Sequence, residues 1–273
     1  MDAKDRLIIP LDVASISAAE PLVAALAPHV GLFKVGLQLF HNEGPRAIEL
    51  LRQEGVGCFY DGKFYDIPNT VSGAVSAVTR LGVKILNVHA SGGKKMLAAA
   101  AEAAETTALN SGLPRPLVFG VTIVTSIDDS ALLDDLGVGR PMEEQVLHLA
   151  RLSQDAGLDG VVCSALEAPL IKRACGPDFQ IICPGIRPKG ADLQDQERVV
   201  TPAMAREAGA DYIVVGRPIT QAKDPVAAAQ NVVKELKEAI IKDYPDLWLF
   251  IQFMYYCFIR PGELRWIRVS DIM

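Results

Sequence analysis

The sequence is poor in cysteine, and the few it has stand at no recognisable metal-binding or disulfide spacing. No C-x-x-C pair and no Cys/His cluster occurs among its five cysteines, which are Cys58, Cys163, Cys175, Cys183 and Cys257. This distribution argues against a zinc site and against a disulfide framework, and it fits a reducing, cytoplasmic environment. No redox-cofactor motif and no metal motif is found either, so we expect neither a cofactor nor a metal.

The chain also lacks an excess of positive charge, a signal peptide and a long apolar run. Its net charge of −6 predicts no broad basic surface, so nucleic acid is not an expected partner and an anionic ligand needs local groups to hold it. Residues 1–6 are charged and lead straight into an apolar segment, unlike a signal peptide. The apolar run at residues 247–259 is shorter than the ~20 residues of a membrane span, so no membrane association is expected.

What the sequence does have is a regular alternation of short β-branched runs and longer helical stretches, typical of β-α units on a parallel sheet. About eight such units in ~250 residues is the size of a (β/α)8 TIM barrel. We predict strands at residues 7–11, 32–35, 58–61, 85–88, 117–122, 160–163, 180–183 and 212–215. In such a barrel the chemistry lies where strands end and loops begin.

Two helix boundaries are predicted from local signals. Ser17 and Glu20 have the spacing of a capping box for the first helix. The pattern over residues 42–54 predicts one helix that ends at Gly55.

The most informative stretch is residues 59–70, FYDGKFYDIPNT. If it ends a strand, the period of two places Asp61 and Lys63 on one face, with Asp66 in the following loop. Two carboxylates and an ammonium persist in a desolvated site only when they compensate one another, and proton transfer needs such groups. The alternative is an ordinary ion pair at the protein surface, which contributes little.

Residues 61–70 closely resemble the signature of the orotidine 5'-phosphate decarboxylase family. Further segments that match the family follow in the same order over residues 6–240: LD at 11–12, KVG at 34–36, NVHASGG at 87–93, TIVTS at 122–126, PGIRP at 184–188 and GRP at 216–218. The resemblance implies a (β/α)8 barrel that converts orotidine 5'-phosphate to uridine 5'-phosphate (UMP) and carbon dioxide.

The resemblance also implies the catalytic residues. Lys63 is the expected proton donor to the ring carbon, and Asp61 and Asp66 flank it and favour its charged form. Lys34 completes an alternating row of lysines and aspartates, although a strand-end lysine that snorkels to solvent is the alternative. In the family, Asp66 and Thr70 act across a homodimer interface.

The other implied roles are in substrate binding. Asp12 matches a ribose-contacting carboxylate, with a helix N-cap as the alternative; Thr125 and Ser126 match hydroxyls that read the pyrimidine, with a simple turn as the alternative. Gly216 and Arg217 are expected to hold phosphate. Arg187 and Gln196 lie on a polar stretch that is either a lid over the ligand or a solvated loop. His89 is expected to keep the barrel floor hydrogen-bonded, outside the site.

Two residues depart from the family pattern, Gly62 where many relatives have a larger apolar residue and Tyr65 where many have histidine. Both departures concern packing. A rival within the same class is a Mg²⁺-dependent sugar-phosphate enzyme on a related barrel, which chelation would distinguish.

The last segment differs in composition from the rest. We predict a barrel over residues 1–240 and an apolar, aromatic tail over residues 241–273 that is not an independent domain. Residues 260–272 weakly resemble the segment around the first catalytic arginine of tyrosine recombinases, with Arg260 in that place, but the other catalytic residues of that family do not follow. The alternative to an enzyme of this family is a DNA-binding recombinase fragment, which only this tail supports. Salt-sensitive binding of duplex DNA would test that alternative.

Overall fold

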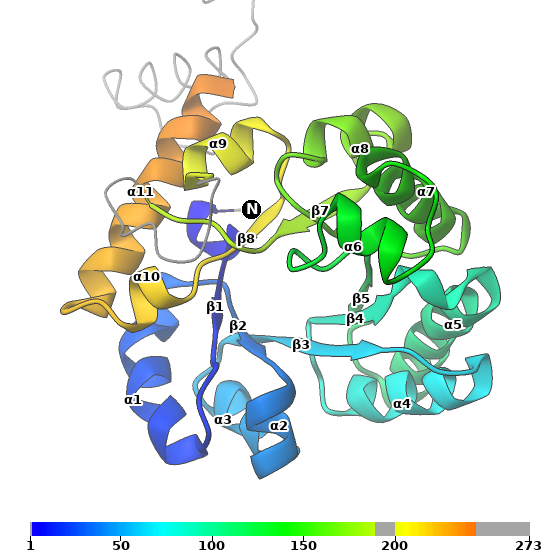
Figure 1. Cartoon of the computed structure of the whole chain (residues 1–273). Coiled ribbons are helices and arrows are strands. Elements are labelled where there is room, and N and C mark those ends of the chain that lie inside the picture. Colours follow the sequence, from blue (N-terminus) through cyan, green and yellow to red (C-terminus); the bar gives the residue numbers. More distant parts are fainter. Residues whose placement is uncertain (1, 189–199, 244–273) are drawn as a thin grey trace, which may run out of the picture.

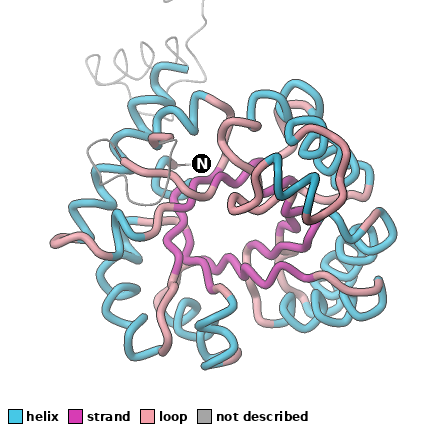
Figure 2. The backbone as a smooth tube through the Cα atoms, viewed as in Figure 1, coloured by secondary structure: helices cyan, strands magenta, loops and turns pink. Residues whose placement is uncertain are grey.

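Eight parallel strands form a closed barrel, and helices surround it (Figures 1 and 2). The computed structural model describes residues 2–188 and 200–243, with the backbone alone for residues 240–243. Each strand pairs with the next along the chain, and β8 closes the barrel on β1. The strands are β1 Leu7–Pro10, β2 Leu32–Val35, β3 Gly57–Phe64, β4 Ile85–His89, β5 Leu117–Val121, β6 Gly160–Val162, β7 Gln180–Cys183 and β8 Tyr212–Val214.

Helices connect successive strands around the outside of the barrel (Figure 2). The α-helices are α1 Ile16–Leu26, α2 Leu37–Glu43, α3 Arg46–Gln53, α4 Pro68–Arg80, α5 Lys94–Ser111, α6 Asp129–Asp134, α7 Met142–Asp155, α8 Ala168–Cys175, α9 Pro202–Glu207, α10 Arg217–Thr220 and α11 Pro225–Asp243. Short 3₁₀ helices occupy Ala3–Arg6, Ala27–His29 and Ala90–Gly92. The predicted (β/α)8 barrel is therefore confirmed.

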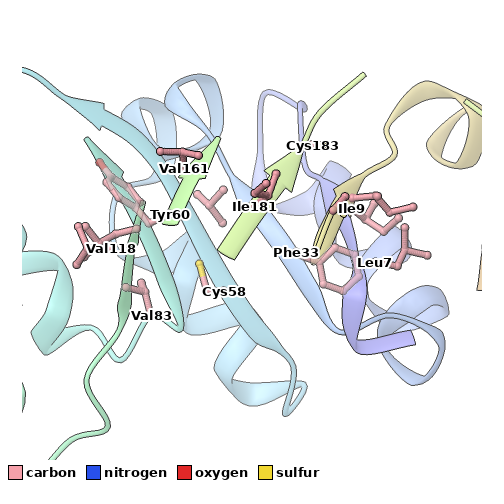
Figure 3. Packing of buried hydrophobic residues seen from close by; sticks show 14 of the residues in the cluster. Leu7, Ile9, Phe33, Cys58, Tyr60, Val83, Val118, Val161, Ile181 and Cys183 are labelled. Atoms are coloured by element: carbon pink, nitrogen blue, oxygen red, sulfur yellow. The ribbon is translucent and has the colours of Figure 1, made fainter. Parts of the chain in front are cut away.

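Alternation along the strands divides the core into two layers. The inner cluster consists of strand residues alone, and it fills the barrel; it contains Ile8, Leu32, Phe59, Ile85, Phe119, Ile182, Tyr212 and Val214. Their neighbours along each strand point outward and pack against the helices. Figure 3 shows part of this outer layer, with Leu7, Ile9 and Phe33 close together. This alternation decides which polar side chains at the strand ends point into the barrel mouth.

Two predicted helix boundaries are wrong in detail. The N-cap of α1 is Ser15, whose backbone is extended and whose hydroxyl accepts a hydrogen bond from the Ala18 N–H at 3.3 Å, so Ser17 lies inside the helix. The helix expected over residues 42–54 begins instead at Arg46 as α3; residues 42 and 43 are the end of α2, which stops at Gly44, where φ is 61°. Gly55 follows α3 with a φ of 67°, in agreement with a stop at that glycine.

The predicted tail lies almost entirely outside the described residues. Helix α11 continues to Asp243, and residues 244–273, which include Arg260 and the recombinase-like segment, are not described. Among the helices that are described, none has both the length and the apolar character that crossing a membrane requires.

Candidate active site

Strand β3 positions the two central charged residues. It is longer than its neighbours (Figure 1). Its pairing with β4 shifts between Tyr60 and Phe64, so the chain is bulged where Asp61 and Lys63 lie. Lys63 has a φ of 48°, and it is the only non-glycine residue with a positive φ in the described part of the chain. A residue with a side chain adopts this conformation only where its surroundings hold it there.

Asp61 lies between two lysines and contacts each with a different oxygen. Its Oδ1 is 2.6 Å from Lys63 Nζ, and its Oδ2 is 3.1 Å from Lys34 Nζ. Lys34 Nζ also lies 3.2 Å from Oδ1 of Asp12. The four side chains therefore form a continuous row of alternating charge in the order Asp12, Lys34, Asp61, Lys63.

Burial and mutual attraction act in opposite directions on the pKa values of Lys34 and Asp61. Burial alone would lower the pKa of Lys34, but the carboxylates of Asp61 and Asp12 outweigh it and the pKa is raised. Burial alone would raise the pKa of Asp61, but Lys34 and Lys63, with a hydrogen bond from Asn87, hold it below its usual range. Asp61 and Lys34 are thus both charged over the whole neutral pH range.

Lys34 and Asp61 lie at the barrel mouth because they continue the inner layer of their strands. Lys34 is two residues beyond Leu32, and Asp61 is two residues beyond Phe59. Side chains two residues apart on a strand share a face, so these two charges stand above the apolar interior. Lys63 follows the bulge, where this alternation is interrupted, and it joins the row through its contact with Asp61. The 13% exposed side chain of Lys34, held by two carboxylates, does not snorkel to solvent.

A cavity of about 370 Å³ opens at this mouth, within the usual size of ligand sites. Its wall includes Phe59, Ile123, Val162, Ile186 and Val214 as apolar groups. The predicted site residues that line it are Asp12, Lys34, Asp61, Lys63, Thr125, Arg187, Gly216 and Arg217. The structure thus gathers residues from six strand ends, as far apart in sequence as Asp12 and Arg217, around one space.

Two arginines stand on the β7 and β8 side of the cavity. Arg217 is the first residue of α10, directly after Gly216. A Cβ atom at position 216 would lie 3.0 Å from Cγ of Pro10, so the glycine allows β8 and β1 to approach closely there. Arg187 is buried, and its backbone N–H donates to the carbonyl of Val200 at 3.0 Å.

Three predicted residues do not line the cavity in a single chain. Asp66 and Thr70 are exposed, and the carboxylate of Asp66 accepts a hydrogen bond from the N–H of Ile67 instead of flanking Lys63. Ser126 is exposed in a turn closed by a hydrogen bond from the Ile127 N–H to the Val124 carbonyl. Gln196 lies outside the described residues.

The structure excludes the alternative role of Asp12, and it corrects the expected place of His89. Ser15 is the N-cap of α1, and Asp12 pairs with Lys34. His89 is not at the barrel floor: it ends β4, on the mouth side, and its ring lies 5.9 Å from that of Tyr65. Burial and the charge of Lys63 lower the pKa of His89, which keeps the imidazole neutral at pH 7.

Asn87 is a further residue of the site, one to which the sequence motifs assign no role. Its side chain is fully buried, and it bonds to both Asp61 and the backbone of Lys63. The sequence signal is a polar residue among the apolar residues on the inner face of a predicted strand, because a buried polar side chain needs a hydrogen-bond partner.

The departure at position 62 is explained by Tyr60. A Cβ atom on Gly62 would come within 2.3 Å of the Tyr60 ring, so the ring takes the space that a larger residue would occupy. The same ring packs against Phe40 and Phe64 at centroid distances of 4.7 and 5.6 Å.

A closed (β/α)8 barrel with a mixed row of lysines and aspartates at its carboxyl-end mouth defines a barrel enzyme. The family model described as "Orotidine 5'-phosphate decarboxylase / HUMPS family" matches residues 5–232. The chain belongs to this family.

Curated relatives and solved structures agree with this assignment. The orotidine 5'-phosphate decarboxylase of Moorella thermoacetica is 51% identical over 237 residues, which cover 87% of this chain and 94% of that protein. The enzyme of the same name from Syntrophotalea carbinolica is 50% identical, covering 88% of this chain and 98% of its own. The crystal structure of orotidine 5'-phosphate decarboxylase from Lactobacillus acidophilus superposes with a TM-score of 0.74 at 39% identity, over 84% of this chain and 98% of that one.

Proposed function

We propose that this chain decarboxylates orotidine 5'-phosphate to UMP without a metal or organic cofactor, and that Lys63 supplies the proton. The observation that carries the proposal is the row of Lys34, Asp61 and Lys63 at the bottom of a ligand-sized cavity. Relatives about half identical to this chain carry the name of this activity.

The reaction has a simple balance of bonds and charge. The bond from C6 of the pyrimidine to the carboxylate carbon breaks, carbon dioxide leaves, and the electron pair remains on C6. That pair lies in an sp² orbital with no ring position to accept it, so the site must stabilise the carbanion and protonate it. Lys63 gives the proton to C6 and becomes a neutral amine, which solvent then reprotonates.

The charged row suits this chemistry because it is organised before the substrate arrives. Asp61 holds the Lys63 ammonium at 2.6 Å, and Lys34 balances the second oxygen of the same carboxylate. A cation fixed beside the reacting carbon stabilises negative charge that develops there without any reorganisation in the transition state. The carboxylate of Asp61 in turn repels a substrate carboxylate placed against it, and departure of carbon dioxide relieves this repulsion.

The remaining polar residues have binding roles in this proposal. Arg217 and the backbone at Gly216 bind the phosphate, assisted by Arg187. Asp12 contacts the ribose, and Thr125 reads the pyrimidine edge, with Ser126 beside it in the same turn. Gln196 contributes from the segment that follows Arg187.

We further propose a cytoplasmic homodimer in which Asp66 and Thr70 complete the site of the partner subunit. Both residues are exposed, and they belong to a stretch from Tyr65 to Thr70 in which every residue is exposed, including the apolar Tyr65 and Ile67. Exposed apolar side chains beside a ligand cavity favour a protein contact at this place. The activity belongs to the barrel over residues 1–240, and we expect no binding of duplex DNA.

The test is the ultraviolet absorbance change of orotidine 5'-phosphate in the presence of excess EDTA. We expect steady turnover, with one carbon dioxide released for each UMP formed, in the full chain and in a version that ends at Ala239. The absence of turnover, or turnover that stops with EDTA and returns with Mg²⁺, would contradict the proposal and favour the metal-dependent alternative.

A further inference from the structure

Asn87 occupies a special position opposite the bulge in β3. The paired residues are Tyr60 with Leu86 and Phe64 with Val88, so Asn87 alone faces the three residues from Asp61 to Lys63. A shift of this kind leaves backbone groups of the bulged strand without partners in the regular ladder. The side chain of Asn87, fully buried between the two strands, takes the place of the missing ladder partner.

Its two hydrogen bonds reach the two central residues of the site. Asn87 Oδ1 accepts from the backbone N–H of Lys63 at 2.8 Å, and Asn87 Nδ2 donates to Asp61 Oδ1 at 2.7 Å. These partners fix the orientation of the amide, because a backbone N–H can only donate and an ionised carboxylate can only accept. The Asn87 side chain therefore links the carboxylate of Asp61 to the backbone of Lys63.

The bond to Lys63 is needed because of the backbone conformation there. A φ of 48° is unfavourable for a residue with a Cβ, so without a fixed partner the segment would relax toward an ordinary strand conformation. The bond to Asp61 has a second effect. Lys63 Nζ and Asn87 Nδ2 both bind Oδ1, which leaves Oδ2 directed at Lys34.

We propose that Asn87 is a positioning residue that holds Lys63 and Asp61 in the geometry required for proton transfer. Asn87 is not among the residues that line the cavity, so it acts through its two partners and not on the substrate. This inference rests on the proposed role of Lys63 as the proton donor.

Two substitutions separate positioning from folding. Asn87→Ala removes both hydrogen bonds. We expect its kcat to fall roughly 100-fold or more, because a displacement of a catalytic group by about 1 Å lowers the rate by about that factor. The affinity for UMP should stay within about threefold of the wild-type value, because Asn87 does not line the cavity. Asn87→Asp keeps the shape and the acceptor for the Lys63 N–H. Its new carboxyl group can donate to Asp61 only when protonated, so we expect the ratio of its kcat to that of the wild type to rise as the pH falls from 8 to 5.5.

Ser153→Ala is the matched control. Ser153 is equally buried and donates to the Leu149 carbonyl at 2.8 Å, on α7 and away from the cavity. We expect a similar loss of thermal stability in Ser153→Ala with kcat unchanged. A merely structural role for Asn87 would instead give two variants with equal stability and equal kcat, and that result would overturn the inference.

A readout without substrate distinguishes failure of this inference from failure of the proposed function. Amide hydrogen exchange of Lys63 in the full-length protein should be slow in the wild type and in Asn87→Asp, and fast in Asn87→Ala. Equal protection in all three would overturn the inference whatever the activity. If the wild type does not decarboxylate orotidine 5'-phosphate, the proposed function is wrong, and the exchange result still decides whether Asn87 holds Lys63. If Asn87→Ala does not fold, the pH-dependent ratio of Asn87→Asp decides the question, and a flat ratio would overturn it.

Discussion

Lys63 Nζ lies 2.6 Å from Oδ1 of Asp61, two residues before it on the same strand, and the other oxygen of that carboxylate faces Lys34. One anion is therefore shared by two cations at the entrance of an apolar barrel. Because removal of a buried charge leaves its partners with less compensation, Asp61 should be important for stability as well as for the proposed reaction.

The first prediction concerns the stability of Asp61→Asn. The substitution leaves two ammonium groups with less compensation, so we expect the free energy of unfolding to fall by about 1–3 kcal/mol at pH 7. Urea unfolding followed by circular dichroism measures this, with Asp135→Asn, an exposed aspartate next to α6, as the control.

The pH dependence of that difference has a defined sign. Asp61 has a lowered pKa, so its contribution is present above the ordinary value of 3.8 and is lost as the pH falls further. Lys34 has a raised pKa, so its contribution is present below 10.5 and is lost as the pH rises further. The difference in the free energy of unfolding between wild type and Asp61→Asn should be largest between these two pH values. A difference that does not depend on pH would contradict the assignment to ion pairs.

The second prediction concerns Arg217→Ala. If Arg217 binds phosphate with charge-assisted hydrogen bonds, its loss should weaken UMP roughly 100-fold and leave the weak binding of uridine unchanged. Isothermal titration with the two ligands measures the difference. Arg173→Ala, on the exposed face of α8, is the control that keeps the net charge equal. Equal weakening of UMP and uridine would show that Arg217 does not recognise the phosphate.

The third prediction concerns the partner subunit. Lys63→Ala and Asp66→Ala should each be nearly inactive alone. When they are mixed and subunits exchange, the heterodimer has one site with both residues intact, so activity should return to at most about one quarter of the wild-type value. If Asp66 acts within its own chain, mixing restores nothing.

The fourth prediction concerns Glu167, which lies outside the proposed catalytic row. Burial raises the pKa of its carboxyl group to about 7, with a smaller effect of Glu143, although the Ser164 N–H donates to it at 3.0 Å. A raised pKa means that the contribution to stability is complete below 4.5 and is lost as the pH rises through 7.

Glu167→Gln keeps the acceptor for Ser164 but cannot ionise. Relative to the wild type, the variant should gain about 1–3 kcal/mol of stability between pH 5 and pH 8.5. Urea unfolding at the two pH values measures the change, with Glu102→Gln on the exposed face of α5 as the control. A gain of the same size in the control would contradict the assignment to burial.

Strand positions were predictable because a parallel strand buried on both faces has a strong apolar signature. All eight predicted strands correspond to strands of the barrel, mostly within one residue at each end. β3 is the exception, because it continues through charged residues to Phe64. Its extension depends on pairing between Phe64 and Val88 and on the Asn87 side chain, which are contacts across strands that composition does not reveal.

The residues of the site were predictable where they lie on the inner face of a strand near its carboxyl end, as for Lys34 and Asp61. The contact between Lys63 and Asp61 was expected from alternation, although the bulge interrupts that alternation. Position along a loop was less informative. Ser126 follows Thr125 directly in the turn from Val124 to Ile127, yet only Thr125 lines the cavity, and their adjacency in sequence does not show this difference. The contact between the Tyr60 ring and Gly62 also could not be read from the sequence. The ring fills the space that a larger side chain at position 62 would occupy.

The measurement that tests the central claim most directly compares Lys63→Ala with wild type for carbon dioxide release from orotidine 5'-phosphate and for UMP binding. We expect the release rate to fall at least ~1000-fold while UMP still binds and the barrel still unfolds cooperatively. Lys95→Ala, an exposed lysine on α5, should retain full activity. Carbon dioxide release by Lys63→Ala at the wild-type rate would show that this ammonium is not the proton donor.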